Sequence, residues 1–202
     1  MHPNSLYRHQ DTAETLALAR MRGFGVVTAN IDGLFGAHVP FVLTSDDQLH
    51  LHLHRGNPLA KAASKAPVPV MVIISLCDAY VSPDWYGLGP DQVPTWIYGA
   101  VHLHGTLTAL PDAALEPMLA ELSATFEARL APKLPWTLDK MSDKPKQALM
   151  RAIQPFEMAI SKVEATDKFA QNKPIEALER LAAHIETSVG SNLSAVKARL
   201  SP

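Results

Sequence analysis

Cysteine is almost absent from this chain, since Cys77 is the only one among 202 residues. A single thiol cannot form a disulfide within the chain, so a reducing cytoplasm is the expected setting. Cys77 also lies in the apolar run of residues 70–77, where burial predicts an unreactive thiol. Catalysis by a nucleophilic cysteine is therefore not expected.

The chain also lacks long apolar runs, a large net charge and the common catalytic motifs. No apolar run approaches the roughly 18 residues of a membrane span, and Asp11 and Glu14 interrupt any secretory signal. The formal net charge of −2 gives little electrostatic reason for nucleic-acid binding. We find no Walker loop, no Gly-x-Ser-x-Gly elbow, no dinucleotide fingerprint and no basic recognition helix. We expect a cytoplasmic protein with no membrane contact and no direct DNA binding.

Strand patterns, by contrast, are frequent, and 47% of the residues are apolar. Alternating or β-branched stretches predict strands at residues 24–29, 36–43, 50–54, 68–76, 97–107 and 156–168. Helical patterns occupy residues 12–21, 58–65, 113–130, 143–153 and much of the segment after residue 172. A doubly wound sheet would need helices between most of the strands. The pattern instead favours an α+β fold, mainly β, built as a small barrel with attached helices.

Two strands carry more specific expectations. Residues 68–76 are almost wholly apolar, which predicts a strand buried on both faces. Pro40 removes one donor from its strand, so we expect an edge or a bulge at that position.

The most informative stretch joins a strand to a helix. Residues 50–54 alternate His and Leu, which is typical of a half-buried strand, and Arg55 stands at its end. Asn57 is a good helix N-cap and Pro58 suits the first helical position, with Lys61 one turn further on. Cationic side chains at a helix start predict a site for an anion such as a phosphate. The alternative is an ordinary corner with solvated charges.

Histidines and aromatic residues gather in the same part of the chain. Six of the nine histidines fall between residues 38 and 104, namely His38, His50, His52, His54, His102 and His104. Histidines two apart on one strand face can chelate a metal, but no Cys or acidic residue completes a familiar set, so no metal is expected. Trp85 and Tyr86 lie in a Gly/Pro-rich loop, where they either join the core or cover a partner subunit or a flat ligand.

Several motifs occur in one order along the chain. They are Phe24-Gly25 with Asp32-Gly33, His38-Val39-Pro40-Phe41, residues 52–58 (HLHRGNP), residues 80–86 (YVSPDWY), residues 93–105 (VPTWIYGAVHLHG) and residues 168–173 (KFAQNK). This set resembles the PaiB family of FMN-binding negative transcriptional regulators, which belong to the flavin-reductase-like split-barrel class. The resemblance runs from about residue 4 to residue 173.

The resemblance implies a split β-barrel of the FMN-binding type with a helical C-terminal region. Residues 1–173 would form the split-barrel domain, with a helical insertion at about 112–153, and residues 174–202 a helical tail. Two copies would form a homodimer with FMN held at their interface. If the protein is an enzyme, the flavin would carry hydride or electron transfer.

The residues expected on this basis to bind the cofactor form two sets, one for its phosphate and one for its ring. Arg55 and Lys61 are the candidates for the phosphate by charge, and Asn57 would hold the loop. The residues expected to line the flavin ring or the cavity beside it are His38, His52, Trp96 and His102. Two alternatives stay open. One is a split barrel that binds or degrades haem through a His ligand, and the other is a cofactor-free regulator that acts through protein contacts.

Overall fold

The computed structural model describes residues 2–9 and 11–200. Residues 1, 10 and 201–202 fall within the predicted domain ranges 1–173 and 174–202 but lie outside the described residues. The described chain forms two compact units. Unit 1 comprises the described residues of Met1–Leu18, Ile74–His102 and Val163–Pro202, and unit 2 comprises Ala19–Ile73 and Leu103–Lys162. Three long strands contribute residues to both units.

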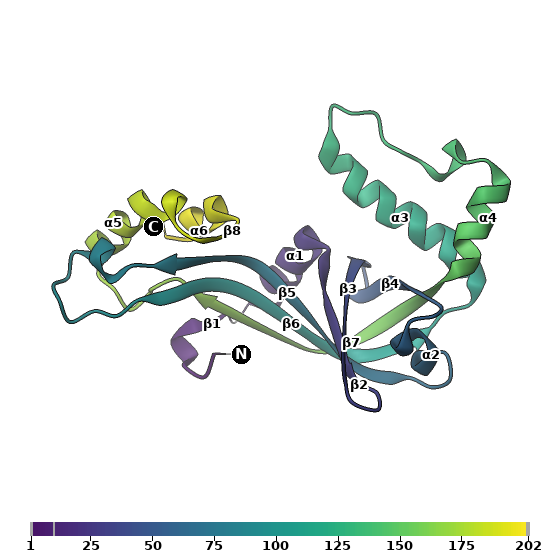
Figure 1. Cartoon of the computed structure of the whole chain (residues 1–202), viewed down its shortest axis with the longest axis horizontal. Coiled ribbons are helices and arrows are strands. Elements are labelled where there is room, and N and C mark those ends of the chain that lie inside the picture. Colours follow the sequence, from purple (N-terminus) through teal and green to yellow (C-terminus); the bar gives the residue numbers. More distant parts are fainter. Residues whose placement is uncertain (1, 10, 201–202) are drawn as a thin grey trace. The chain divides into compact units, whose positions relative to one another are not determined.

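The strands share one antiparallel sheet and are shown in Figure 1. They are β1 (Arg8–His9), β2 (Phe24–Asn30), β3 (Leu34–Leu43), β4 (Gln48–His54), β5 (Val68–Val81), β6 (Thr95–Ala109), β7 (Ile153–Lys168) and β8 (Gly190–Ser191). The α-helices are α1 (Thr12–Arg22), α2 (Pro58–Ala63), α3 (Leu115–Glu127), α4 (Asp143–Ala152), α5 (Ile175–His184) and α6 (Leu193–Leu200). Short 3-10 turns are η1 (Ser5–Tyr7), η2 (Pro83–Tyr86), η3 (Asp112–Ala114), η4 (Ala128–Leu130), η5 (Leu138–Lys140) and η6 (Ile185–Thr187).

The sheet closes on itself. Its order is β1-β7-β4-β3-β2-β5-β6, β8 pairs with β5, and an additional pairing joins β6 to β7. The strands from β7 round to β6 therefore form a closed ring, which leaves no free edge between them. The predicted barrel with attached helices is confirmed.

The core of unit 2 follows from the alternation on β4. Leu49, Leu51 and Leu53 are buried, and in the β4–β7 register Leu51 lies opposite the buried Phe156. Burying each such side chain contributes about 1.5–3 kcal/mol. The histidines of β4 take the alternate positions, as the period of two predicts.

One strand prediction is wrong, and a second holds only in part. β5 is not buried on both faces, because buried residues alternate along it with exposed or half-buried ones such as Pro69. A strand of a closed barrel packs only one face into the core, which accounts for this alternation. β3 lies between β2 and β4 in the sheet, but Pro40 pairs with Phe24 of β2 whereas the β3–β4 register begins at Phe41. Pro40 is thus at a local edge of an inner strand.

Unit 1 has a separate core in which the C-terminal helices take part. Buried residues of α5 and α6 pack in one cluster with the second half of β5 and with Tyr86. In Figure 1 both helices appear in yellow beside β8. Tyr86 is therefore a core residue, whereas Trp85 stacks on His184 with ring centroids 5.6 Å apart.

Cys77 belongs to this core, and burial raises the pKa of its thiol, which supports the expectation of an unreactive group. Over residues 2–9 and 11–200, none of the helices has the length and apolar character needed to cross a bilayer.

The β6–β7 closure depends on a glycine in unit 2. A Cβ placed on Gly105 would overlap the carbonyl oxygen of Ala159 on β7 and lie 3.0 Å from the Met158 Cγ atom. A Cβ on Gly36 of β3 would meet only a Val26 methyl carbon at 3.7 Å, an ordinary contact. Of these two glycines, only Gly105 stands where an added methyl group would force the backbones of β6 and β7 apart.

We predict that Gly105→Ala lowers the free energy of unfolding by about 1–3 kcal/mol, because overpacking displaces β6 from β7. Gly36→Ala is the matched control, and it should leave stability unchanged or raise it by about 0.5–1 kcal/mol, since alanine has less backbone entropy to lose. Urea unfolding followed by circular dichroism measures both. Equal midpoints for the two variants would contradict the proposed role of Gly105.

Candidate functional site

The β4–α2 corner has the local geometry that its sequence predicts. Asn57 is the N-cap of α2, its Oδ1 accepts a hydrogen bond from the Leu59 N–H at 2.9 Å, and Pro58 follows as the first helical residue. The Asn57 N–H donates to the carbonyl oxygen of His54 at 2.8 Å, and the Gly56 N–H donates to His54 Nδ1 at 2.9 Å. These hydrogen bonds fix the backbone between β4 and α2.

The start of α2 offers few free donors for an anion. The helix has six residues, Pro58 has no N–H, and the Leu59 N–H is bonded to Asn57. The Asn57 N–H is also occupied. Backbone amides therefore contribute less here than the sequence pattern suggests, and an anion at this corner would depend on side chains.

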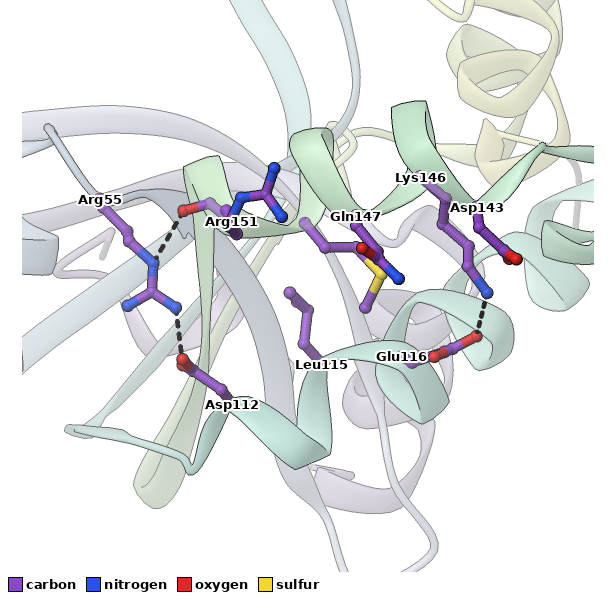
Figure 2. Close-up of a pocket in the computed structure, with 9 residues that line it drawn as sticks. Arg55, Asp112, Leu115, Glu116, Asp143, Lys146, Gln147 and Arg151 are labelled. Carbon is purple, nitrogen blue, oxygen red and sulfur yellow. Dashed lines mark hydrogen bonds and ion pairs between the residues drawn. The ribbon is translucent and has the colours of Figure 1, made fainter.

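Arg55 is held by three acceptors in unit 2, two of which Figure 2 marks with dashed lines. Its Nε donates to the Arg151 carbonyl oxygen at 3.1 Å, and Nη1 donates to Gln154 Oε1 at 3.4 Å. Nη2 donates to Asp112 Oδ1 at 2.6 Å, and both side chains of this ion pair are solvent-accessible, 37% for Arg55 and 72% for Asp112. The guanidinium is fixed in direction but reachable from solvent.

A cavity of about 520 Å³ opens beside this ion pair, as Figure 2 shows. Its lining residues come from the β4–α2 corner, from η3 and the start of α3, and from α4: Arg55, Asp112, Leu115, Glu116, Asp143, Lys146, Gln147, Met150 and Arg151. The cationic and acidic side chains balance in number, and Lys146 pairs with Glu116 at 3.0 Å. The cavity is thus of mixed charge, and an added anion has to compete with carboxylates.

The Arg55–Asp112 ion pair is the interaction that a phosphate at this corner would have to replace. The Arg55–Asp112 pair is exposed, and exposed pairs typically contribute only about 0–1 kcal/mol. Charge-assisted hydrogen bonds from an Arg fork to a phosphate are worth about 1.5–3 kcal/mol. A phosphate that displaced the Asp112 carboxylate would therefore give up only a weak ion pair.

The other charged or aromatic candidates on unit 2 do not line this cavity. Lys61 is solvent-exposed on α2. His38 is exposed on β3, where its ring stacks on Phe24 with centroids 6.2 Å apart, and the Arg22 guanidinium lies over the same Phe24 ring at 5.5 Å. His38 is therefore part of a surface stack of three side chains.

His52 has the least satisfied environment of the predicted residues. Its side chain is half-buried, and its Nδ1 atom is buried with no hydrogen-bond partner among the described residues. Burial lowers the pKa of His52, so the neutral imidazole is favoured at pH 7. An unpaired buried polar atom costs about 1–3 kcal/mol, which fits a site that a ligand completes. Its neighbour His50 has a partner, since its Nε2 lies 3.1 Å from Glu157 Oε2.

Trp96 and His102 lie on the part of β6 that belongs to unit 1. Trp96 is 46% exposed and makes an edge contact with Tyr80 at 6.0 Å between centroids, and His102 is half-buried. The structure therefore places Arg55, Asn57, Lys61, His38 and His52 in unit 2 and these two in unit 1. Within the described part of the chain, no group of three or more His, Cys, Asp or Glu side chains has an arrangement that could hold a metal ion.

Sequence reasoning missed the residues that fix Arg55. Asp112 precedes α3, whereas Arg151 and Gln154 come from the junction of α4 with β7, almost a hundred residues after Arg55. Gln154 lies opposite Leu53 in the β4–β7 register, and its Oε1 also accepts a hydrogen bond from Ser64 Oγ at 2.9 Å. Only knowledge of that strand pairing would have identified these partners.

Comparison with known proteins agrees with the fold and with this cofactor chemistry. The chain is similar to "Protease synthase and sporulation protein PAI 2" of Bacillus subtilis (strain 168), with 26% identity over 177 residues, covering 86% of this chain and 83% of that protein. Its fold is similar to that of the FAD and heme binding protein from Mycobacterium smegmatis, with a TM-score of 0.60, 19% identity and coverage of 88% and 80% of the two chains. It is also similar to the flavocytochrome Anf3 from Azotobacter vinelandii, with a TM-score of 0.56, 13% identity and coverage of 83% and 72%.

At these identities the two structures show the fold alone, and they confirm the predicted split barrel. The model of a family described as "Putative FMN-binding domain" matches residues 1–162. The resemblance to PaiB-type proteins and the prediction of FMN as cofactor are therefore confirmed at the level of the family, and the chain belongs to this family of FMN-binding split-barrel proteins.

Proposed function

We propose that this chain is a cytoplasmic flavoprotein that works as a homodimer and regulates transcription through protein contacts, with Arg55 as the anchor of the FMN phosphate. The observation that carries the proposal is the Arg55 guanidinium. Backbone and amide acceptors direct it, and among the described residues its ion-pair partner is the exposed carboxylate of Asp112. The fork of an Arg can hold two phosphate oxygens at once. Lys61 on α2 would add a point charge, and Asn57 keeps the corner in place.

The ring of the flavin would lie against the histidine and tryptophan side chains. His52 supports this because its Nδ1 is buried and unpaired among the described residues, so a polar ring atom can complete its hydrogen bonding. His38, Trp96 and His102 are proposed as further ring or cavity contacts. FMN supplies hydride or electron transfer when bound, and the chain supplies placement and a neutral imidazole.

The homodimer proposal is supported by an apolar groove on unit 2. The groove has a volume of about 550 Å³, and its lining residues come from β2, β3, β5 and β6: Thr28, Ala29, Asn30, Leu34, Phe35, Pro69, Val70, Met71 and His104. Leu34 at its rim is 98% exposed. Contiguous exposed apolar surface usually marks an interaction site, and a second copy of the chain is the occupant we propose.

Regulation without direct DNA contact is supported by the charge distribution. The net charge is −2. Two lysines in the segment before and within α4 already have partners, since Lys146 pairs with Glu116 and Lys140 Nζ donates to the Pro135 carbonyl oxygen at 2.7 Å. DNA readers instead present clustered, available cations. The reducing compartment is supported by the single, buried cysteine.

Haem is the second proposal for the cofactor, because two proteins of similar fold are a FAD and heme binding protein and a flavocytochrome. His52 Nδ1 on β4 has no hydrogen-bond partner among the residues that the structure describes, and an imidazole nitrogen of this kind can ligate haem iron. Absorption spectra after addition of FMN or haem decide between them. Flavin bands that shift on binding support FMN, and a Soret band that shifts supports haem.

We predict that Arg55→Ala weakens FMN binding about ten- to a hundred-fold and hardly changes riboflavin binding, because riboflavin lacks the phosphate. Fluorescence titration with both ligands measures the two affinities. Arg151→Ala is the matched control, because it removes another cationic side chain from the lining of the same cavity. The Arg151 carbonyl oxygen that accepts from Arg55 is kept, and both affinities should stay nearly unchanged. An equal loss for FMN and riboflavin would assign Arg55 to the fold, and no loss would place the phosphate elsewhere.

We predict the opposite effect at Asp112. Asp112→Asn removes the carboxylate that competes for Arg55, so FMN affinity should rise by up to about fivefold, equivalent to the upper value of about 1 kcal/mol for an exposed pair. Riboflavin affinity should stay constant. Asp143→Asn removes an acidic group from the same cavity without touching Arg55 and controls for the general change in charge. A lower FMN affinity in Asp112→Asn would count against the exchange of partners.

We predict that the wild-type protein has about twice the 22.0 kDa chain mass in solution at micromolar concentration. Leu34→Asp should shift this mass toward that of one chain, because a carboxylate would be buried at the interface. Leu149→Asp on α4, where the leucine is 62% exposed, should leave the mass unchanged. Light scattering gives the masses, and a monomeric wild type would rule out the homodimer.

A further inference from the structure

A second cavity lies wholly within unit 1 and has no part in the flavin proposal. Its volume is about 380 Å³. It is bounded by the segment that leads into β6 and by the turn that follows β7, and its lining residues are Tyr7, Tyr86, Asp91, Gln92, Val93, Thr95, Lys168, Ala170, Asn172 and Lys173. The volume falls in the range of small-molecule sites.

The turn after β7 is held in a strained conformation. Ala170 is buried and has a φ of 58°, a left-handed value that a residue with a Cβ rarely adopts. Hydrogen bonds on both sides fix it, because the Phe169 N–H donates to Gln171 Oε1 at 2.8 Å and the Lys173 N–H donates to the Ala170 carbonyl oxygen at 2.9 Å. Such strain persists where surrounding contacts determine the backbone, and it clusters at ligand sites. Lys168 and Lys173 stand on either side of this turn.

Both ammonium groups have neutral partners. Lys168 Nζ donates to Thr95 Oγ1 at 2.8 Å, and Lys173 Nζ donates to Gln92 Oε1 at 2.5 Å. Lys173 Nζ also lies 5.1 Å from the centroid of the Tyr86 ring. Neither lysine forms an ion pair with a carboxylate within residues 2–9 and 11–200. Asp91 is the one acidic residue in the cavity lining, so the positive charge there is only partly balanced.

Neutral polar groups and an apolar wall complete the cavity. The Tyr7 hydroxyl donates to Asn172 Oδ1 at 3.4 Å, which leaves the Asn172 amide nitrogen as a donor. Tyr86 is almost fully buried, and burial raises the pKa of its hydroxyl, so it adds no negative charge near pH 7. Val93 and Ala170 supply apolar surface.

We propose that this cavity binds a small organic anion, with its carboxylate or phosphate group between Lys168 and Lys173 and its apolar part against Val93 and the Tyr86 ring. An ammonium group with a neutral acceptor gains more from an added anion than one already paired with a carboxylate, since the new interaction replaces a weaker bond. Arg55, Asn57 and Lys61, the residues proposed for the flavin phosphate, do not line this cavity.

The test uses inorganic phosphate and succinate as probes in the full chain, with sodium chloride at equal ionic strength as the reference. Isothermal titration calorimetry should detect saturable binding of at least one probe. A preference for phosphate indicates a phosphorylated ligand, and a preference for succinate indicates a carboxylate ligand. Lys168→Gln and Lys173→Gln should each weaken binding about tenfold or more, because each removes a charged donor.

Two further variants keep the test decisive. Lys173→Arg retains the charge and should keep most of the affinity, which separates a charge effect from loss of the fold. Lys144→Gln on α4 removes an exposed lysine of unit 2 and should change nothing. Absence of saturable binding of both probes would overturn the proposal, as would an equal loss in Lys144→Gln.

A titration with FMN separates this proposal from the flavin site. The two Gln variants should bind FMN with wild-type affinity. If they lose FMN affinity together with probe affinity, the cavity receives the flavin phosphate, and the proposal of a separate anion site is wrong.

Discussion

The pairing of β4 with β7 is the interaction on which the candidate flavin site depends. Its register sets Leu51 against Phe156 in the core of unit 2 and Leu53 against Gln154 near the strand end. The ladder continues past β4, because the Arg55 N–H donates to the Ala152 carbonyl oxygen at 2.9 Å. The same pairing that buries the core thus carries the acceptors that direct the Arg55 guanidinium. A shift of the register by one residue would turn every β4 side chain to the other face and remove these acceptors.

Features encoded by neighbouring residues could be predicted from the sequence. The alternation of residues 50–54, the Asn57 cap and Pro58 each depend on contacts within a few positions, and all three appear in the structure. The burial of β5 could not be inferred this way, because an apolar run does not say how many faces a strand packs. The prediction for Pro40 holds in part, because a local pattern again does not show which strands lie on either side. Its missing donor requires a local edge, but only the β3–β4 register shows where that edge begins.

The groups that pair with a candidate side chain could not be predicted from the neighbouring residues in the sequence. Arg55 and Lys61 look alike as charges near a helix start, yet one is bonded to three acceptors and the other is solvent-exposed. The difference arises from Asp112, Arg151 and Gln154, which the fold brings in from distant elements. The same holds for His52. The alternation of β4 predicts which face its side chain is on, but not that Nδ1 is buried without a partner among the described residues. Motif order compensated for this gap by identifying the family, whereas the roles of individual residues stay predictions.

The two anion sites proposed here differ in how their cations are balanced, and this difference has a physical consequence. At Arg55 the proposed anion would replace the Asp112 carboxylate, so its free energy of binding would be a difference between two charged interactions. Added salt screens the exposed Arg55–Asp112 pair as well as the incoming phosphate, which reduces the net effect of ionic strength. Lys168 and Lys173 exchange neutral acceptors, so screening acts mainly on the new interaction. Binding in the unit 1 cavity should therefore decrease more steeply with salt than the phosphate contribution at Arg55.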